Sequence, residues 1–200
     1  MLRSGELVAE VEDGLDVLWH DEADAAAVTE GLREATNSAR HEDPHGVLDE
    51  LRTEYARLFT GPGVAAVAGF ESQYAAGRGD PSASVFGAVT AAVAESLAEE
   101  GVRAAAGLPA DRATAELEFL YHLSAREAAA LQSGDQDEAR RLRAARKRFV
   151  VRHAGTWLPL LADDLGPASD CGLYAGLATL LGSFLRAEVG AIPQTEGDGR

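Results

Sequence analysis

The stretch PADRATAELEFLYHL, residues 109–123, decides the fold that we predict for this chain. Its apolar residues are Leu117, Phe119, Leu120, Tyr121 and Leu123. On a helix these side chains point to more than one side, so the helix would be covered on most of its faces. Pro109 and Asp111 suit a first turn, because proline there loses no needed N–H and a carboxylate interacts favourably with the positive helix end. We therefore predict a central helix that starts at Pro109.

Four helices are predicted before the central one. Residues 6–18 and 22–38 form an amphipathic pair. A third helix runs from Asp43-Pro44 to Gly61-Pro62, and a fourth begins at Asp80-Pro81 and ends near Gly101. Apolar residues recur at helical spacing in both, namely Leu48, Leu51, Tyr55, Leu58 and Phe59 in the third and Val85, Val89, Val93 and Leu97 in the fourth.

Further helices follow the central one. Gly134 ends the central helix, and Asp135 with Glu138 makes a capping box for the next. That helix is arginine-rich and then apolar, and Pro159 should kink it or begin a new turn. Its late apolar face carries Phe149, His153, Trp157, Leu160 and Leu161, and a last helix carries Leu173, Leu177, Leu180, Leu181 and Phe184.

No stretch alternates with the period of two that is typical of a strand, so we predict an all-α fold. It has seven or eight helices in a single domain, residues 1–190, followed by a polar tail, residues 191–200. The longest loop, Gly61–Asp80, contains the compact cluster Phe70-Glu71-Ser72-Gln73-Tyr74. Long loops tend to carry function, and we expect this loop to cross near the start of the central helix.

The charge balance is unusual, because 33 acidic residues against 18 basic ones give a net charge of −15, and Lys147 is the only lysine. Such a surface repels nucleic acid. An acid-rich chain that uses arginine almost exclusively is typical of proteins from halophiles, where short screening lengths make dense negative charge tolerable. Attraction of a basic partner is the alternative explanation.

A halophilic surface predicts that stability rises with salt. In molar potassium chloride the repulsion among the surplus carboxylates is screened, so the unfolding midpoint should increase. A midpoint that is flat between low and molar salt would contradict this interpretation.

Several features favour a cytoplasmic protein. The single cysteine, Cys171, has no partner for a disulfide or a thiolate metal site, and it suits a small buried position. Residues 1–24 lack the pattern of a signal peptide. The longest uncharged stretch, Cys171 to Leu185, is shorter than the roughly 20 residues that a bilayer requires, so we expect no membrane insertion.

One alternative from the residues is a metal enzyme. Glu118 and His122 are four residues apart and could face one metal ion, with Glu116 and His153 approaching it. However, helical two-metal sites normally take Glu-x-x-His repeats, and the match beginning at Glu42 is interrupted by a proline. We favour structural roles for His153, as a core residue, and for Asp111, as a helix cap or first-turn acid, whereas a role as loop anchors is one of two equal alternatives for Glu71, Ser72 and Tyr74.

The chain resembles the TorD/DmsD family of redox-enzyme maturation chaperones, to which NarJ proteins are related. Four clusters occur in the family's order: Glu54-Tyr55-Ala56-Arg57-Leu58-Phe59 with Gly61-Pro62, then Glu71-Ser72-Gln73-Tyr74, then Asp111 with Glu116-Leu117-Glu118-Phe119-Leu120, then Phe149 with His153 and Trp157. Each cluster alone is a weak signal. Together, in a helical chain of this length, they are specific, and they cover most of the sequence.

The resemblance implies a cytoplasmic, non-catalytic chaperone that needs no cofactor of its own. Its partners would be the twin-arginine signal peptide and the body of a molybdopterin-dependent oxidoreductase of the DMSO/TMAO, nitrate or selenate reductase type, during cofactor insertion. The peptide-binding residues that it implies, together with neighbours that could supply carboxylates and apolar contacts, are Glu71, Ser72, Tyr74, Asp111, Arg112, Glu116 and Trp157.

Two departures from the family pattern bear on this site. Arg112 stands where the family usually has histidine, which adds a fixed positive charge beside Asp111, and Gly69 with Phe70 replaces prolines. The third function that we consider is that of a structural adaptor, which would bind a folded partner at the same site. We expect the protein to be a monomer or a homodimer.

Overall fold

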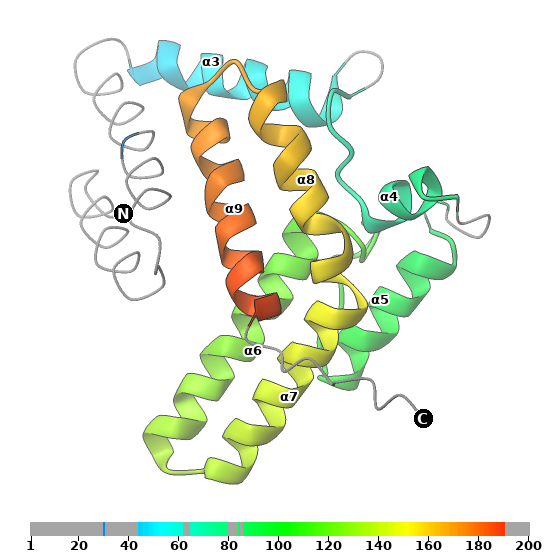
Figure 1. Ribbon diagram of the computed structural model, residues 1–200, viewed down its shortest axis with the longest axis vertical. Helices are drawn as coiled ribbons and strands as arrows, with labels where there is room; N and C mark the ends of the chain where they lie inside the picture. Colours follow the sequence, from blue (N-terminus) through cyan, green and yellow to red (C-terminus); the bar gives the residue numbers. More distant parts are fainter. Residues whose placement is uncertain (1–29, 31–43, 62–64, 80–83, 85, 191–200) are drawn as a thin grey trace, which may run out of the picture. The chain divides into compact units, whose positions relative to one another are not determined.

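The computed structural model describes residues 30, 44–61, 65–79, 84 and 86–190. Within them the elements are α3 (Pro44–Tyr55), a π-helical turn η1 (Ala56–Thr60), α4 (Glu71–Gly77), α5 (Ala88–Glu99), α6 (Ala113–Ser133), α7 (Gln136–Arg152), α8 (Ala154–Ala168) and α9 (Gly172–Gly190) (Figure 1). The described residues contain no strand beyond an isolated bridge between Phe70 and Arg112. The predicted all-α fold is confirmed. The helices predicted at 6–18 and 22–38 and the tail at 191–200 lie outside the described residues.

The chain divides into two compact units. The first comprises residues 1–68 and 159–184, and the second comprises residues 69–158 and 185–200. Helices α8 and α9 therefore contribute residues to both. The division into one domain and a tail at residue 190 stays a prediction.

In the first unit, the helix predicted from Asp43-Pro44 is present as α3 and η1 and ends at Gly61. Leu58 is fully buried, and Leu51 and Phe59 are half-buried. The other two members of the predicted apolar face, Leu48 and Tyr55, are exposed. The apolar face is thus covered mainly near its C-terminal end.

A carboxylate near the end of α3 anchors this helix to the residues that join α8 to α9. Glu54 accepts hydrogen bonds from Arg57 at 2.7 and 2.8 Å, from the Ser169 hydroxyl at 3.2 Å and from the Asp170 N–H at 2.8 Å. The hydrogen bonds from Arg57 are the main reason that the pKa of Glu54 falls from 4.5 to about 2. Glu54 and Arg57, which belong to the first cluster of the family resemblance, therefore stabilise the first unit.

In the second unit, the central helix α6 starts at Ala113, so its predicted start at Pro109 is wrong. The backbone just before it pairs with a distant segment instead. The Glu71 N–H donates to the Asp111 carbonyl at 2.9 Å, and the Ala113 N–H donates to the Gly69 carbonyl at 3.1 Å. This extended pairing holds residues 111–112 out of the helix. It also confirms that the 61–80 segment crosses near the start of the central helix.

Helix α6 is buried along one face rather than on most of its faces. Its buried residues are Ala115, Glu116, Phe119, Leu120, Leu123, Glu127 and Ala130, which recur at helical spacing. Tyr121, by contrast, is 76% exposed. The expectation of a helix covered on most faces is therefore wrong, because Tyr121 lies opposite the packed stripe.

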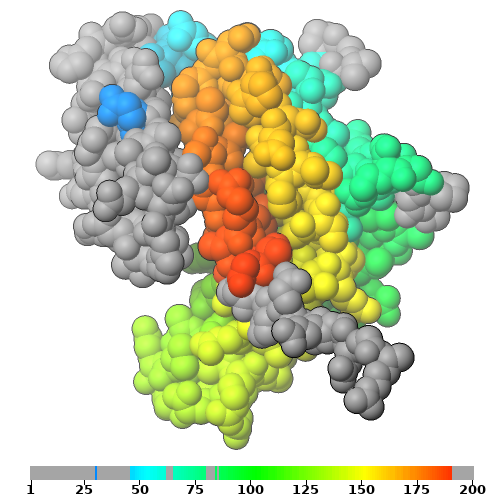
Figure 2. Space-filling view, in the orientation of Figure 1, coloured from blue at the N-terminus to red at the C-terminus, as the bar shows by residue number. Residues whose placement is uncertain are grey.

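Helices α6 and α7 form an antiparallel hairpin within the second unit, which Figure 2 shows as a continuous yellow-green lobe. Gly134 turns the chain with a φ of 80°, a left-handed conformation that favours glycine. The Asp135 side chain then accepts the Glu138 N–H at 3.0 Å. The turn and the cap predicted at Gly134 and Asp135 are confirmed.

The break after α7 occurs at His153, not at Pro159 as predicted. His153 has φ −130° and ψ −92°, outside the helical region, and α8 starts at the next residue. Pro159 is inside α8. The backbone is closely packed at this break. A Cβ atom on Gly155 would lie only 2.7 Å from the Val150 carbonyl oxygen.

Replacing Gly155 by alanine should therefore destabilise the protein by about 1–3 kcal/mol, since a backbone oxygen at that distance cannot move aside cheaply. Gly166→Ala in the same helix is the matched control, because its Cβ atom would meet only the Ala178 Cβ at 3.9 Å. It should be neutral or stabilising by up to about 1 kcal/mol. Chemical denaturation of both variants measures the difference, and equal effects would contradict the steric explanation.

Candidate functional site

The candidate site is a buried polar cluster in the second unit, where α4 packs on the start of α6. The predicted 61–80 loop is not irregular throughout, because residues 71–77 form α4. This helix has no capping side chain on its own N-cap residue, Phe70. Instead the Asp111 carboxylate accepts the Ser72 N–H at 3.1 Å. Asp111 thus caps a helix, as local sequence suggested, but it caps α4 from a distance rather than α6.

Three carboxyl groups come together in this cluster. Glu71 is 6% exposed, and Asp111 and Glu116 are 0% exposed. They come from α4, from the turn before α6 and from the first turn of α6. Buried carboxyl groups are costly unless they are hydrogen-bonded or neutral, so their partners decide their charge.

Glu116 is held by the indole of Trp157, from α8. The Trp157 N–H contacts both carboxyl oxygens of Glu116, at 3.1 and 3.0 Å, and Trp157 is itself fully buried. Burial raises the pKa of Glu116 well above 4.5, and the negative charges of Glu71 and Asp111 raise it further, although the Trp157 N–H opposes them. A neutral Glu116 is therefore favoured in the folded protein.

Glu71 is paired with the one imidazole of the cluster. Its carboxylate lies 3.1 Å from His153 Nδ1, and His153 Nε2 lies 3.0 Å from the Ser96 hydroxyl of α5. His153 is 6% exposed, which confirms its predicted core position. The sequence did not suggest Ser96, because a serine in an alanine-rich helix carries no local signal. A hydrogen-bonded chain thus runs from α5 through His153 to Glu71.

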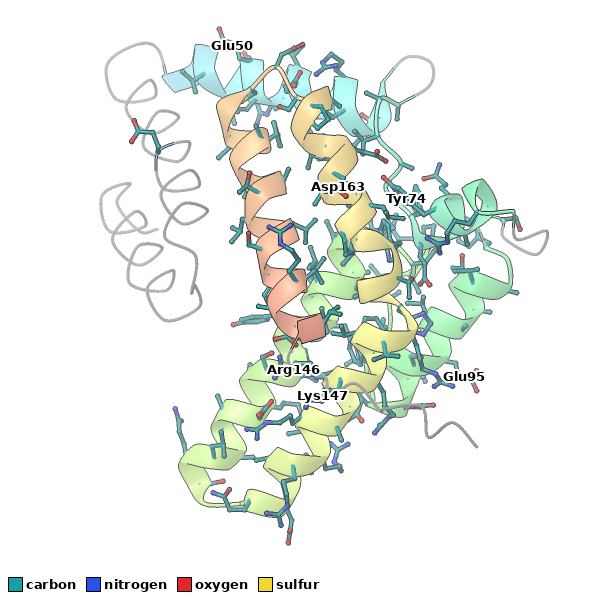
Figure 3. All side chains as sticks on the ribbon, in the orientation of Figure 1. Glu50, Tyr74, Glu95, Arg146, Lys147 and Asp163 are labelled. Carbon is teal, nitrogen blue, oxygen red and sulfur yellow. The ribbon has the colours of Figure 1, made fainter. Side chains whose placement is uncertain are left out.

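Two buried oxygen atoms of the cluster have no hydrogen-bond partner among the described residues: Ser72 Oγ and Asp111 Oδ1. Tyr74 is half-buried, and its ring centroid lies 5.5 Å from that of Trp157. Figure 3 labels Tyr74, which belongs to α4. Arg112 is half-buried and pairs through its backbone with Phe70. The structure therefore places all seven sequence-predicted site residues around the α4 and α6 junction, five of them buried.

The residues of the alternative metal site do not form one group. Glu116 and His153 are buried in the cluster, whereas Glu118 is exposed and His122 is half-exposed. Within the part of the chain that the structure describes, no three His, Cys, Asp or Glu residues are grouped so that they could hold a metal ion. The cluster's chemistry is that of hydrogen bonding and of a carboxyl group held neutral.

Comparison with models of protein families identifies a family that covers most of the chain. A family model described as nitrate reductase delta subunit matches residues 21–163, which include every candidate site residue. No curated protein and no solved structure matches the sequence. None of the helices in the described residues has the length and apolar character needed to cross a membrane.

Proposed function

Because the chain belongs to the nitrate reductase delta subunit family, whose members are redox-enzyme maturation chaperones, we propose that it binds the twin-arginine signal peptide of its client enzyme. The family acts in the maturation of molybdoenzymes and not as catalysts. The client would be a molybdopterin-dependent oxidoreductase of the DMSO/TMAO, nitrate or selenate reductase type. The chaperone would hold its signal peptide and its body in the cytoplasm during cofactor insertion.

The observation that carries this proposal is the surplus of buried carboxyl groups over cations. Glu71, Asp111 and Glu116 lie in one cluster with one imidazole and the half-buried Arg112, and Asp111 Oδ1 has no hydrogen-bond partner among the described residues. A guanidinium group would supply both a positive charge and N–H donors that match carboxylate geometry. Twin-arginine peptides present two such groups.

Binding at Asp111 requires a change in the segment that covers it, because its side chain is fully buried. The covering helix α4 has only seven residues, and its first two N–H groups bond to Asp111. We therefore propose that α4 moves to admit an arginine of the peptide. Glu71, Ser72, Tyr74 and Arg112 then line the opening, while Glu116 and Trp157 form its base.

Asp111→Asn tests this proposal. Asparagine keeps an oxygen that can accept the Ser72 N–H, so the α4 cap and the stability should change by less than about 1 kcal/mol. Loss of the charge-assisted bond to a guanidinium should weaken peptide binding by about 1.5–3 kcal/mol, which is ten- to a hundredfold. Calorimetric titration of a client leader peptide into both proteins measures this.

Arg112→His is the control, because it restores the pair usual in the family and should keep or improve affinity. The titrations belong at the salt concentration where the protein is most stable. Equal affinity of wild type and Asp111→Asn, with a wild type that clearly binds, would remove Asp111 from the site and leave it only as the cap of α4.

A further inference from the structure

Phe86 has an unusual backbone conformation for a bulky residue. Its φ is 62°, and all other residues with positive φ in the described part of the chain are glycines. This left-handed region is unfavourable for most side chains, because Cβ comes too close to the following carbonyl oxygen. The Gly87 N–H donates to the Ser84 carbonyl at 2.7 Å, so Phe86 occupies the third position of a β-turn, where a positive φ favours glycine.

The fold gains little from the Phe86 side chain, which is 68% exposed. Phe86 precedes Gly87, the N-cap residue of α5, and an apolar residue there often packs on the fourth residue of the helix as a hydrophobic staple. In α5 that fourth residue is Ala91, which is small and exposed. A single exposed apolar residue needs no explanation, but one that also strains the backbone indicates a function.

Local hydrogen bonding fixes the backbone that presents the Phe86 ring. The Phe86 N–H donates to the Thr90 hydroxyl at 3.1 Å, and Thr90 is itself buried. An aromatic ring on a fixed backbone is a typical anchor in binding, because it buries a large apolar area and loses little conformational freedom when a partner covers it.

Phe86 lies within reach of the buried carboxyl cluster. Ser96 follows ten residues later, mostly within α5, so the two residues are at most about 20 Å apart. The Ser96 hydroxyl contacts His153, which in turn contacts Glu71 of the cluster. Helices α4 and α5 also contact each other within the second unit, where Figure 1 shows them as neighbours. An extended peptide covers about 20 Å with roughly six residues.

We propose that Phe86 anchors the apolar stretch of the same signal peptide whose arginine binds at Asp111. This inference rests on the proposed function and extends it from the charged to the apolar part of the peptide. Signal peptides carry positively charged residues followed by about 7–15 apolar residues, which is long enough to reach Phe86 from the cluster. Such a peptide is cationic at its start, so the net charge of −15 attracts it.

The test titrates two synthetic peptides calorimetrically into the full chain. Both peptides contain two consecutive arginines, followed by about twelve alternating Leu and Ala residues in the first and by about twelve alternating Ser and Gly residues in the second. Wild type should bind the apolar peptide about tenfold more tightly than the polar one. Phe86→Gly should remove most of this preference and leave the affinity for the polar peptide within about twofold, because only the apolar contact is lost.

Phe86→Gly also separates binding from folding, since glycine adopts a positive φ without strain. The unfolding midpoint should therefore stay the same or rise by up to about 4 °C. A lower midpoint would show that the ring stabilises the fold, which would overturn the inference. Tyr121→Ala is the matched control, because it removes an aromatic ring that is 76% exposed on α6. It should keep both affinities within about twofold.

Equal weakening in Phe86→Gly and Tyr121→Ala would overturn the assignment, because any exposed aromatic ring would then serve. An unchanged preference for the apolar peptide in Phe86→Gly would also overturn it, while the proposed function would stand if Asp111→Asn still weakened the binding of both peptides. A wild type that binds neither peptide would reject the proposed function and this inference together.

Discussion

Replacing Glu116 by alanine is expected to lower the free energy of unfolding by about 2–4 kcal/mol. The variant leaves the buried Trp157 N–H without the acceptor that it contacts at 3.0 and 3.1 Å, and it opens a cavity at a fully buried position. Chemical denaturation at a pH below 4.5, where the Glu116 carboxyl is neutral in both the folded and the unfolded protein, measures the loss without a contribution from charge.

Glu116→Gln is the matched control, and it adds a pH test. Glutamine has a similar shape, remains neutral and keeps an oxygen for the Trp157 N–H. The pKa of Glu116 is raised above 4.5 in the folded protein. Its neutral form therefore contributes stability that is fully present below pH 4.5. This stability is lost as the pH rises from about 4.5 towards the pKa of the folded protein. The glutamine variant should lack this loss, so its advantage over wild type should grow with pH. Parallel pH profiles of the two proteins would contradict a neutral Glu116.

Replacing His153 by phenylalanine is expected to destabilise the protein by about 3–5 kcal/mol. The change removes the partner of two polar groups at once, since Glu71 Oε2 lies 3.1 Å from Nδ1 and the Ser96 hydroxyl 3.0 Å from Nε2. Glu71 would be left as a buried carboxylate without its imidazole, which costs more than the pair itself contributes. Denaturant unfolding at neutral pH checks the value.

A double-mutant cycle with Glu71→Leu separates this explanation from loss of packing. When both partners are apolar, no charge is left unpaired, so Glu71→Leu with His153→Phe should recover about 1–3 kcal/mol relative to the sum of the single changes. Strictly additive effects would show that the two side chains are not energetically coupled.

The parts of the fold that were predictable depend on signals within a few residues of one another. The Gly134 turn, the Asp135 cap and the end of η1 at Gly61 follow from the local backbone chemistry of glycine and aspartate. The apolar spacing of α5 correctly marked Val93 and Leu97 as buried. Such signals need no knowledge of the rest of the chain.

The errors arise where a distant segment competes with the local signal. Pro109 and Asp111 were predicted to start the helix. Instead, the backbone before Ala113 pairs with residues 69–71, and this tertiary contact keeps residues 111–112 out of the helix. Tyr121 was predicted to belong to a helix covered on most faces, but its side chain is 76% exposed. The break at His153 accompanies close packing near Gly155, which no residue pattern announces.

The sequence by itself determined the all-α class, several helix ends and, through its four clusters, the family of the chain, whereas the helix starts predicted at Asp80-Pro81 and Pro109 were wrong. The tertiary structure alone decided that Glu71, Asp111, Glu116 and His153 meet in one buried cluster. The physical reason is the separation along the chain over which each kind of interaction acts. Capping and helical periodicity act over a few residues, whereas the burial, charge state and pairing of these groups depend on segments tens of residues apart in the chain.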